Sequence, residues 1–138
     1  MNAPSYSGGC LCGGVRYQVT GRVDNLCYCH CESCRRAAGA PLVAWGTFAR
    51  DRFVITKGRL AEYRSSAKVT RGFCANCGTS IAYRQDKRPA EIDVTLVTLD
   101  DPAVFEPEAH IWVRDKLPWL AIADGKPQFR QFRPVNQQ

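Results

Sequence analysis

Cysteines are the residues of this 138-residue chain whose spacing is best suited to chemistry. Thiols at high density serve as disulfides, as metal ligands or as reactive nucleophiles. The start of the chain, MNAPSYSGG, lacks the basic and apolar regions of a secretory signal. We therefore expect a cytoplasmic protein whose cysteines bind metal or react, rather than a disulfide scaffold. The eight cysteines form three groups: Cys10-x-Cys12-Gly, Cys27-x-Cys29-x-Cys31-x-x-Cys34 and Cys74-x-x-Cys77-Gly.

The last of these groups, Cys74-x-x-Cys77-Gly, is the most specific pattern. Its two thiolates approach one ion, and the glycine that follows permits the tight backbone of a metal knuckle. A closed site needs four ligands, and the matching pair is Cys10 and Cys12, which is also followed by glycine. An ion held by all four would staple the first strand to a hairpin in the middle of the chain. Zinc suits four thiolates, and an iron–sulfur cluster also accepts them.

Strand geometry separates Cys27 from the other three cysteines of the central group. Residues two apart on a strand lie about 6.6 Å apart on one face, which puts Cys27 and Cys31 about 13 Å apart. That distance is too long for two ligands of one ion with bonds of about 2.3 Å. A turn after Cys31 would bring Cys34 back, so the predicted chelate is Cys29, Cys31 and Cys34. Cys27 is left as a small buried residue or as a spare, resolving thiol.

Three ligands and an open position are typical of a catalytic zinc site. Zinc with three thiolates has a negative formal charge, so it activates water less well than zinc held by three neutral histidines. It still accepts a fourth sulfur, and a substrate thiol held there as thiolate is a nucleophile at neutral pH. We therefore favour thiol activation over metal-assisted hydrolysis.

Four other residues are candidates for this site. His30 would point to the opposite strand face from the cysteines beside it, which favours packing or support over metal ligation. His110 is either an acid, base or substrate contact, or a structural histidine between apolar neighbours. Arg35 and Arg36 follow Cys34 directly, and they either meet a substrate carboxylate or form a solvent-facing turn.

The elements that must position these residues are mostly strands. Apolar alternation predicts antiparallel strands, the last of them covered on both faces near its end. A short helix closed by Gly39 is expected over 32–39, and a turn that begins with proline over 101–107. The predicted fold class is mainly β, with few short helices. The predicted strands cover 14–21, 41–48, 52–58, 60–65 and 91–99.

Length and composition exclude several classes of protein. A chain of 138 residues suits one domain with its own core, and 45% hydrophobic with 23% charged residues argues against disorder. No stretch approaches the ~18 apolar residues of a membrane span. The net charge of +6 favours anionic partners, but the basic residues are scattered along the chain.

Three segments carry a resemblance to a known family: GGCLCGGVRY (8–17), CHCESCRRAAGAP (29–41) and GFCANCGTSIAY (72–83). They are similar to the signature segments of the glutathione-dependent formaldehyde-activating enzyme (GFA) family, also called the centromere protein V-like family. HIWVRDKLPWLAIADGKPQF (110–129) resembles the closing segment of many bacterial members. The resemblance therefore covers a core of about 7–130. It implies one GFA-type domain over 1–138 with an Mss4-like fold, in which antiparallel sheets are stapled by zinc.

The resemblance also implies two zinc ions and a reaction. A structural zinc would be held by Cys10, Cys12, Cys74 and Cys77, and a catalytic zinc by Cys29, Cys31 and Cys34. Cys27 lies outside the family's ligand pattern. The implied reaction adds glutathione to formaldehyde and gives S-(hydroxymethyl)glutathione, which is a carbon–sulfur lyase activity in reverse. Family membership by itself does not fix the substrate.

Two functions of different classes follow. The first is a zinc-dependent carbon–sulfur lyase or synthase that acts on a small thiol, with glutathione as the implied candidate. The second is a non-catalytic zinc-binding module that contacts nucleic acid or another acidic partner. The sequence lacks a basic tail and a basic stripe interleaved with aromatic residues, which makes nucleic acid an unfavourable partner.

Overall fold

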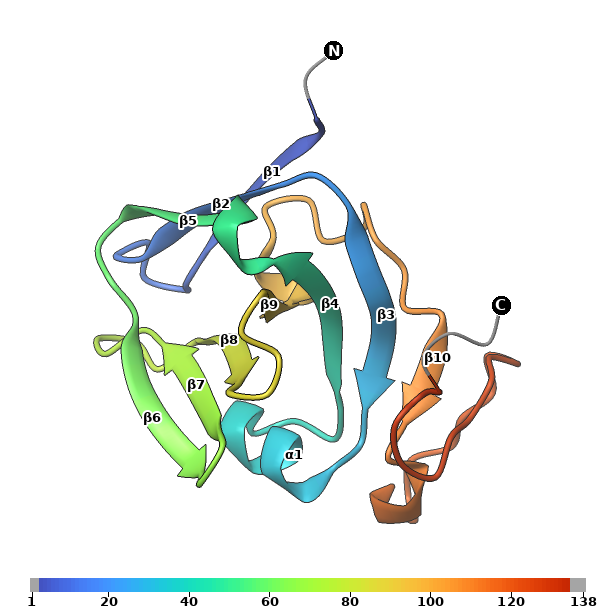
Figure 1. Ribbon diagram of the computed structural model, residues 1–138. Helices are drawn as coiled ribbons and strands as arrows, with labels where there is room; N and C mark the ends of the chain where they lie inside the picture. Colours follow the sequence, from blue (N-terminus) through green and yellow to red (C-terminus); the bar gives the residue numbers. More distant parts are fainter. Residues whose placement is uncertain (1–2, 135–138) are drawn as a thin grey trace.

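Two β-sheets form most of the computed structural model, which describes residues 3–134 (Figure 1). The smaller sheet contains β1 (Ser5–Gly9), β2 (Arg16–Thr20) and β5 (Phe53–Lys57), in the order β1-β2-β5. The larger sheet contains β3 (Val23–Cys29), β4 (Val43–Ala49), β6 (Ala61–Ser66), β7 (Val69–Phe73), β8 (Ser80–Gln85), β9 (Glu91–Thr95) and β10 (Ala109–Ile111). Its order is β10-β3-β4-β9-β8-β7-β6. Strand β10 is parallel to β3, and the other pairs are antiparallel.

Helical structure is short throughout the described residues. It consists of the helix α1 (Glu32–Ala38) and three 3₁₀ turns, η1 (Arg50–Arg52), η2 (Leu96–Thr98) and η3 (Val113–Asp115). The prediction of a mainly β fold with few short helices is confirmed. Within residues 3–134, none of the helices has the length and apolar character needed to cross a lipid bilayer.

The strand predicted over 91–99 is wrong beyond Thr95, where β9 ends and η2 begins. The hydroxyl of Thr98 donates to the backbone carbonyl oxygen of Thr95 at 2.8 Å. Hydrogen bonds of this local kind compete with the sheet for the backbone. The resulting turn buries Leu96 and exposes Val97.

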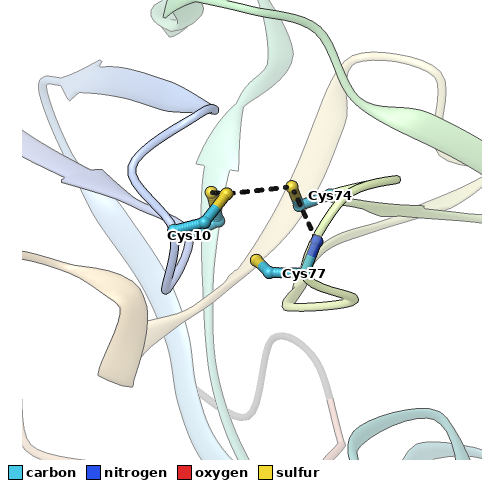
Figure 2. Close-up of side chains that lie close together, drawn as sticks. Cys10, Cys74 and Cys77 are labelled. Carbon is cyan, nitrogen blue, oxygen red and sulfur yellow. Dashed lines mark hydrogen bonds between the residues drawn. The ribbon is translucent and has the colours of Figure 1, made fainter.

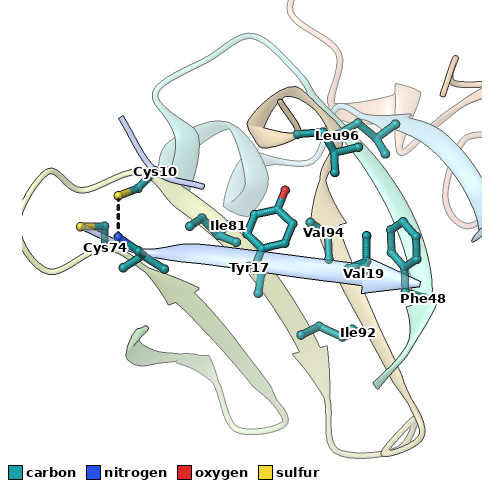
Figure 3. Close-up of a cluster of buried hydrophobic side chains, with 12 residues drawn as sticks. Cys10, Tyr17, Val19, Phe48, Cys74, Ile81, Ile92, Val94 and Leu96 are labelled. Carbon is teal, nitrogen blue, oxygen red and sulfur yellow. Dashed lines mark hydrogen bonds between the residues drawn. The ribbon is translucent and has the colours of Figure 1, made fainter. Parts of the chain in front are cut away.

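The two faces of the larger sheet have different surroundings, because side chains alternate along each strand. One face packs against the smaller sheet: Tyr17 and Val19 of β2 lie over Ile81 and Val94 (Figure 3). The opposite face carries a second buried cluster, which includes Trp45, and it lines the cavity described below. The core between the two sheets thus covers one face of the larger sheet, and the other face is accessible to ligands.

Helix α1 begins and ends at residues that suit its boundaries. Cys31 is the N-cap, and its sulfur accepts a hydrogen bond from the backbone N–H of Cys34 at 3.4 Å. Gly39 ends the helix with a φ of 62°, a left-handed conformation that glycine adopts without steric cost. The predicted helix over 32–39 is therefore confirmed. Figure 1 shows α1 at one end of the larger sheet, between β3 and β7.

The C-terminal segment runs beside β10. The backbone N–H of Phe129 donates to the carbonyl oxygen of His110, and the N–H of Trp112 donates to that of Gln131, both at 2.9 Å. The ring of Phe132 then packs edge-on against Trp112, with a centroid distance of 5.2 Å. This segment therefore forms part of the wall of the cavity.

Two neighbouring substitutions test the turn that ends β9. Leu96 is 2% exposed and Val97 is 70% exposed. Leu96→Ala leaves a hole in the core and is expected to lower the free energy of unfolding by about 2–5 kcal/mol. Val97→Ala is expected to change it by less than about 0.5 kcal/mol. Urea unfolding of the metal-loaded protein measures both values, and equal losses would contradict the turn.

Candidate functional site

The four-cysteine group joins two turns of the chain. Cys10 and Cys12 lie between β1 and β2, whereas Cys74 and Cys77 lie between β7 and β8. Their sulfur atoms lie within 4.8 Å of one another, and the labelled side chains in Figure 2 point toward a common centre. Cys10 and Cys74 also belong to the buried core between the sheets (Figure 3). The group therefore links the two sheets at the edge of the core.

The sulfur spacing in this group fits a tetrahedral metal ion. The Sγ atoms of Cys10 and Cys12 are 3.6 Å apart, and those of Cys12 and Cys74 are 3.8 Å apart. A tetrahedron with metal–sulfur bonds of about 2.3 Å has edges of about 3.8 Å. Three backbone N–H groups also donate to sulfurs of the group, which favours thiolates. None of the eight cysteines is in a disulfide.

The three-cysteine group lies where β3 ends and α1 begins. Cys29 is the last residue of β3, Cys31 caps α1, and Cys34 lies in the first turn of the helix. Their sulfur atoms lie within 4.8 Å of one another, so the turn after Cys31 brings Cys34 back as the spacing predicts. Hydrogen bonds from Cys29 and Cys34 lower the pKa of the Cys31 thiol to about 2. This group, too, is placed to hold a metal ion.

A buried arginine of β7 reaches the three-cysteine group. The Nη1 and Nη2 atoms of Arg71 lie 3.9 and 3.8 Å from the Sγ of Cys34. Its Nε donates to the Oγ of Ser65 at 3.2 Å, and its guanidinium lies over the ring of Tyr83. Arg71 and Tyr83 are direct partners across β7 and β8. The sheet register thus fixes the arginine beside Cys34.

A cavity of about 560 Å³ lies beside this group and is lined by all three of its cysteines. The volume falls in the range of roughly 300–1,000 Å³ that is usual for small-molecule sites. Four aromatic side chains form part of its wall and keep part of the space apolar. These aromatic residues are Trp45, Tyr83, Trp112 and Phe132.

Charged side chains also line the cavity, and most of them are paired. Arg88 lies 3.1 Å from Asp93, whose carboxyl has its pKa raised by burial. Arg133 lies 3.4 Å from Glu108, which is outside the lining. Lys87 is exposed and forms no ion pair among residues 3–134. The cavity therefore offers at least one free cation to an anionic ligand.

Comparison with known families shows which protein family this chain belongs to. Residues 5–115 match the family described as glutathione-dependent formaldehyde-activating enzyme. This span is more than half of the chain, and it contains both cysteine groups. The chain belongs to the GFA family. The family assignment made from the three sequence segments is thus confirmed.

Two known proteins extend this comparison. A Schizosaccharomyces pombe protein named an uncharacterized lyase is 31% identical over 115 residues, which cover 82% of each chain. A crystal structure of a Rhodobacter sphaeroides protein is similar in fold, with a TM-score of 0.56 and 23% sequence identity. The match covers 89% of this chain and 98% of that one. The structural likeness supports the mainly β fold.

Cys27 stands apart from both cysteine groups of this GFA protein. It is buried on β3 opposite Trp45 and lines the cavity. Burial raises the pKa of its thiol to about 12, so the thiol is protonated at neutral pH. A protonated thiol is a weak nucleophile, which supports a packing role over that of a resolving thiol.

The two histidines form a buried chain with Asp124. The Nε2 of His30 lies 2.8 Å from the Nδ1 of His110, whose Nε2 lies 2.7 Å from the Oδ2 of Asp124. Burial lowers the pKa of His30 to about 4, which makes it neutral at pH 7. The hydrogen bond from His110 lowers the pKa of Asp124, so a carboxylate accepts at that end. The Nδ1 of His30 has no hydrogen-bond partner among the described residues.

The positions of the histidines bear on their predicted roles. His30 belongs to neither cysteine group, and neither histidine lines the 560 Å³ cavity. His110 and Asp124 instead line a second, separate hollow with Leu120 and its neighbours. The contact between the two histidines joins the end of β3, at Cys29, to β10, and so supports the pairing of these two strands. A substrate contact for His110 stays a prediction.

Neither Arg35 nor Arg36 lines the cavity. The side chain of Arg36 is 79% exposed and lies 3.0 Å from Glu32, one helical turn away. The Nε of Arg35 donates to the backbone carbonyl oxygen of His30 at 3.2 Å. Contact of these arginines with a substrate carboxylate stays a prediction. The sequence interpretation missed Arg71, because its position beside Cys34 depends on strand pairing across the sheet.

Serine variants of two cysteines are expected to separate the roles of the two groups. Cys74→Ser breaks a link between the sheets, so one metal per chain is lost and Tm falls by about 10 °C or more. Cys31→Ser also removes one metal, but Tm falls by less than half as much, because that group lies beside an open cavity. Atomic absorption counts the metals, and calorimetry gives Tm. Equal falls in Tm would contradict this division.

Proposed function

We propose that this GFA protein is a zinc-dependent carbon–sulfur lyase or synthase. It joins a small thiol, with glutathione as the first candidate, to a small aldehyde such as formaldehyde, and it also catalyses the reverse release. The observation that carries the proposal is the three-cysteine group beside a ligand-sized cavity. A set of three protein ligands leaves a position for substrate, as catalytic zinc sites do.

The donor set favours a thiol over water. A zinc ion there would supply a Lewis acid that holds the substrate's sulfur as thiolate. Three thiolate ligands reduce the positive charge available to stabilise hydroxide, so hydrolysis is disfavoured. The burial of Cys29 and Cys34 keeps bulk water away from two of the three sulfurs.

The reaction is an addition without a change of oxidation state. A new carbon–sulfur bond forms between the thiol and the aldehyde carbon, while the carbon–oxygen double bond becomes single. The proton of the thiol ends on the aldehyde oxygen as a hydroxyl group. The reverse reaction breaks the same carbon–sulfur bond, which is the chemistry of a carbon–sulfur lyase.

The cavity provides groups that suit a peptide-like thiol. Lys87 is free to meet a carboxylate of glutathione, and Arg133 lies on the same lining. Trp45 and Trp112 provide apolar surface for the rest of the ligand and limit the entry of water. The description of the family and the naming of the S. pombe relative as a lyase both support this function.

The proposal predicts that the purified protein speeds the exchange between formaldehyde, glutathione and their adduct. Exchange spectroscopy with ¹³C-labelled formaldehyde measures this rate at equilibrium, in both directions. Cys31→Ser is expected to return the rate to the uncatalysed value, since it removes a ligand of the open site. Arg22→Gln is the matched control because Arg22 is exposed and lies outside the cavity. Unchanged exchange in Cys31→Ser, for every thiol–aldehyde pair tested, would refute the proposal.

A further inference from the structure

Arg71 is a buried cation whose terminal nitrogens both face one sulfur. The residue is 7% exposed, and its Nη1 and Nη2 atoms are each within 3.9 Å of Cys34 Sγ. A neutral thiol is a weak acceptor, whereas a thiolate takes charge-assisted hydrogen bonds from a guanidinium. Both terminal nitrogens of Arg71 are therefore placed to donate to Cys34 when it is a thiolate.

Among the described residues, no carboxylate is paired with this cation. Among residues 3–134, no carboxylate lies within 4.0 Å of the Arg71 side chain. Its remaining contacts are the hydroxyl of Ser65 and the ring face of Tyr83, which are both uncharged. A buried charge without a counterion is strongly unfavourable. The cysteine group, when it is charged, is the counterion that this geometry offers to Arg71.

The four-cysteine group differs in this respect. Its sulfurs accept from backbone N–H groups and approach the hydroxyl of Thr79. Within the described part of the chain, no arginine or lysine side chain donates to them. The two groups share a ligand type, but only the one beside the cavity has a dedicated cation.

We propose that Arg71 is a positioning residue that balances the charge of the three-cysteine site, so that the site accepts an anionic ligand at its open position. This inference rests on the proposed function and names what that site selects, which is a thiolate or another small anion. Three thiolates on a zinc ion already carry a net negative charge. A fourth anionic ligand makes the net charge of the site more negative, and the nearby guanidinium of Arg71 offsets this added negative charge.

Strand pairing keeps Arg71 in place during ligand exchange. Tyr83 lies opposite it on β8, and the guanidinium carbon is 5.0 Å from the centre of that ring. The Ser65 hydroxyl holds Nε from the β6 side. A guanidinium restrained on three sides needs little reorganisation when an anion enters, which is the arrangement that gives selectivity for charge.

The test compares an anionic and a neutral probe on the full-length chain loaded with Co²⁺, whose visible absorption changes when its ligands change. Azide and imidazole are titrated separately into the wild type and Arg71→Met. Methionine retains an unbranched side chain but removes the charge. Azide affinity is expected to fall about tenfold or more, whereas imidazole affinity stays within about twofold. Arg71→Lys, which keeps the charge, is expected to recover most of the azide affinity.

Three results would overturn the inference. Equal weakening of azide and imidazole would show a general structural role, and no weakening of either would show no role at the site. A wild type that binds neither probe would also contradict it, since the open position would then be absent. A charge-selective loss without turnover of any thiol–aldehyde pair would leave this inference standing and remove the proposed function.

Discussion

The structure depends on the meeting of four sulfurs from two turns that are 62 residues apart in sequence. Cys10 and Cys12 lie in the turn between β1 and β2 of the smaller sheet, and Cys74 and Cys77 lie in the turn between β7 and β8 of the larger one. A metal ion held there would add folding free energy to a small β protein and would fix the sheets against each other. Arg71 lies only three residues before Cys74, so the same link sets where β7 presents its side chain to the cavity.

The two cysteine groups show how surroundings divide one ligand chemistry into two roles. The four-cysteine group offers four ligands, the number that a closed metal site needs, and it borders the core. The three-cysteine group has one ligand fewer, borders a 560 Å³ cavity and receives a guanidinium. The family description and the lyase name of the S. pombe relative agree with the lyase function proposed for this chain.

Sequence spacing predicted the seven cysteines of the two groups and left Cys27 out, because the spacing within each cysteine segment is a local property of the chain. The two distant pairs of the four-cysteine group were joined because a closed metal site needs four ligands. Alternation also predicted five of the ten strands in the described residues, β2, β4, β5, β6 and β9, and Gly39 marked the end of α1. It did not predict Arg71 or the chain from His30 to Asp124, since those contacts arise from the pairing of strands distant in sequence. The end of β9 was missed because threonine hydroxyls form local hydrogen bonds that alternation does not show.

Native mass spectrometry of freshly prepared protein, titrated with glutathione, tests the central claim most directly. The account predicts a species with two zinc ions per chain that adds one glutathione. It also predicts that Cys31→Ser loses both the second zinc and the added glutathione, while Arg22→Gln keeps them. A wild-type chain that carries two zinc ions and takes up no glutathione or other thiol would contradict an open, thiol-binding site at Cys29, Cys31 and Cys34.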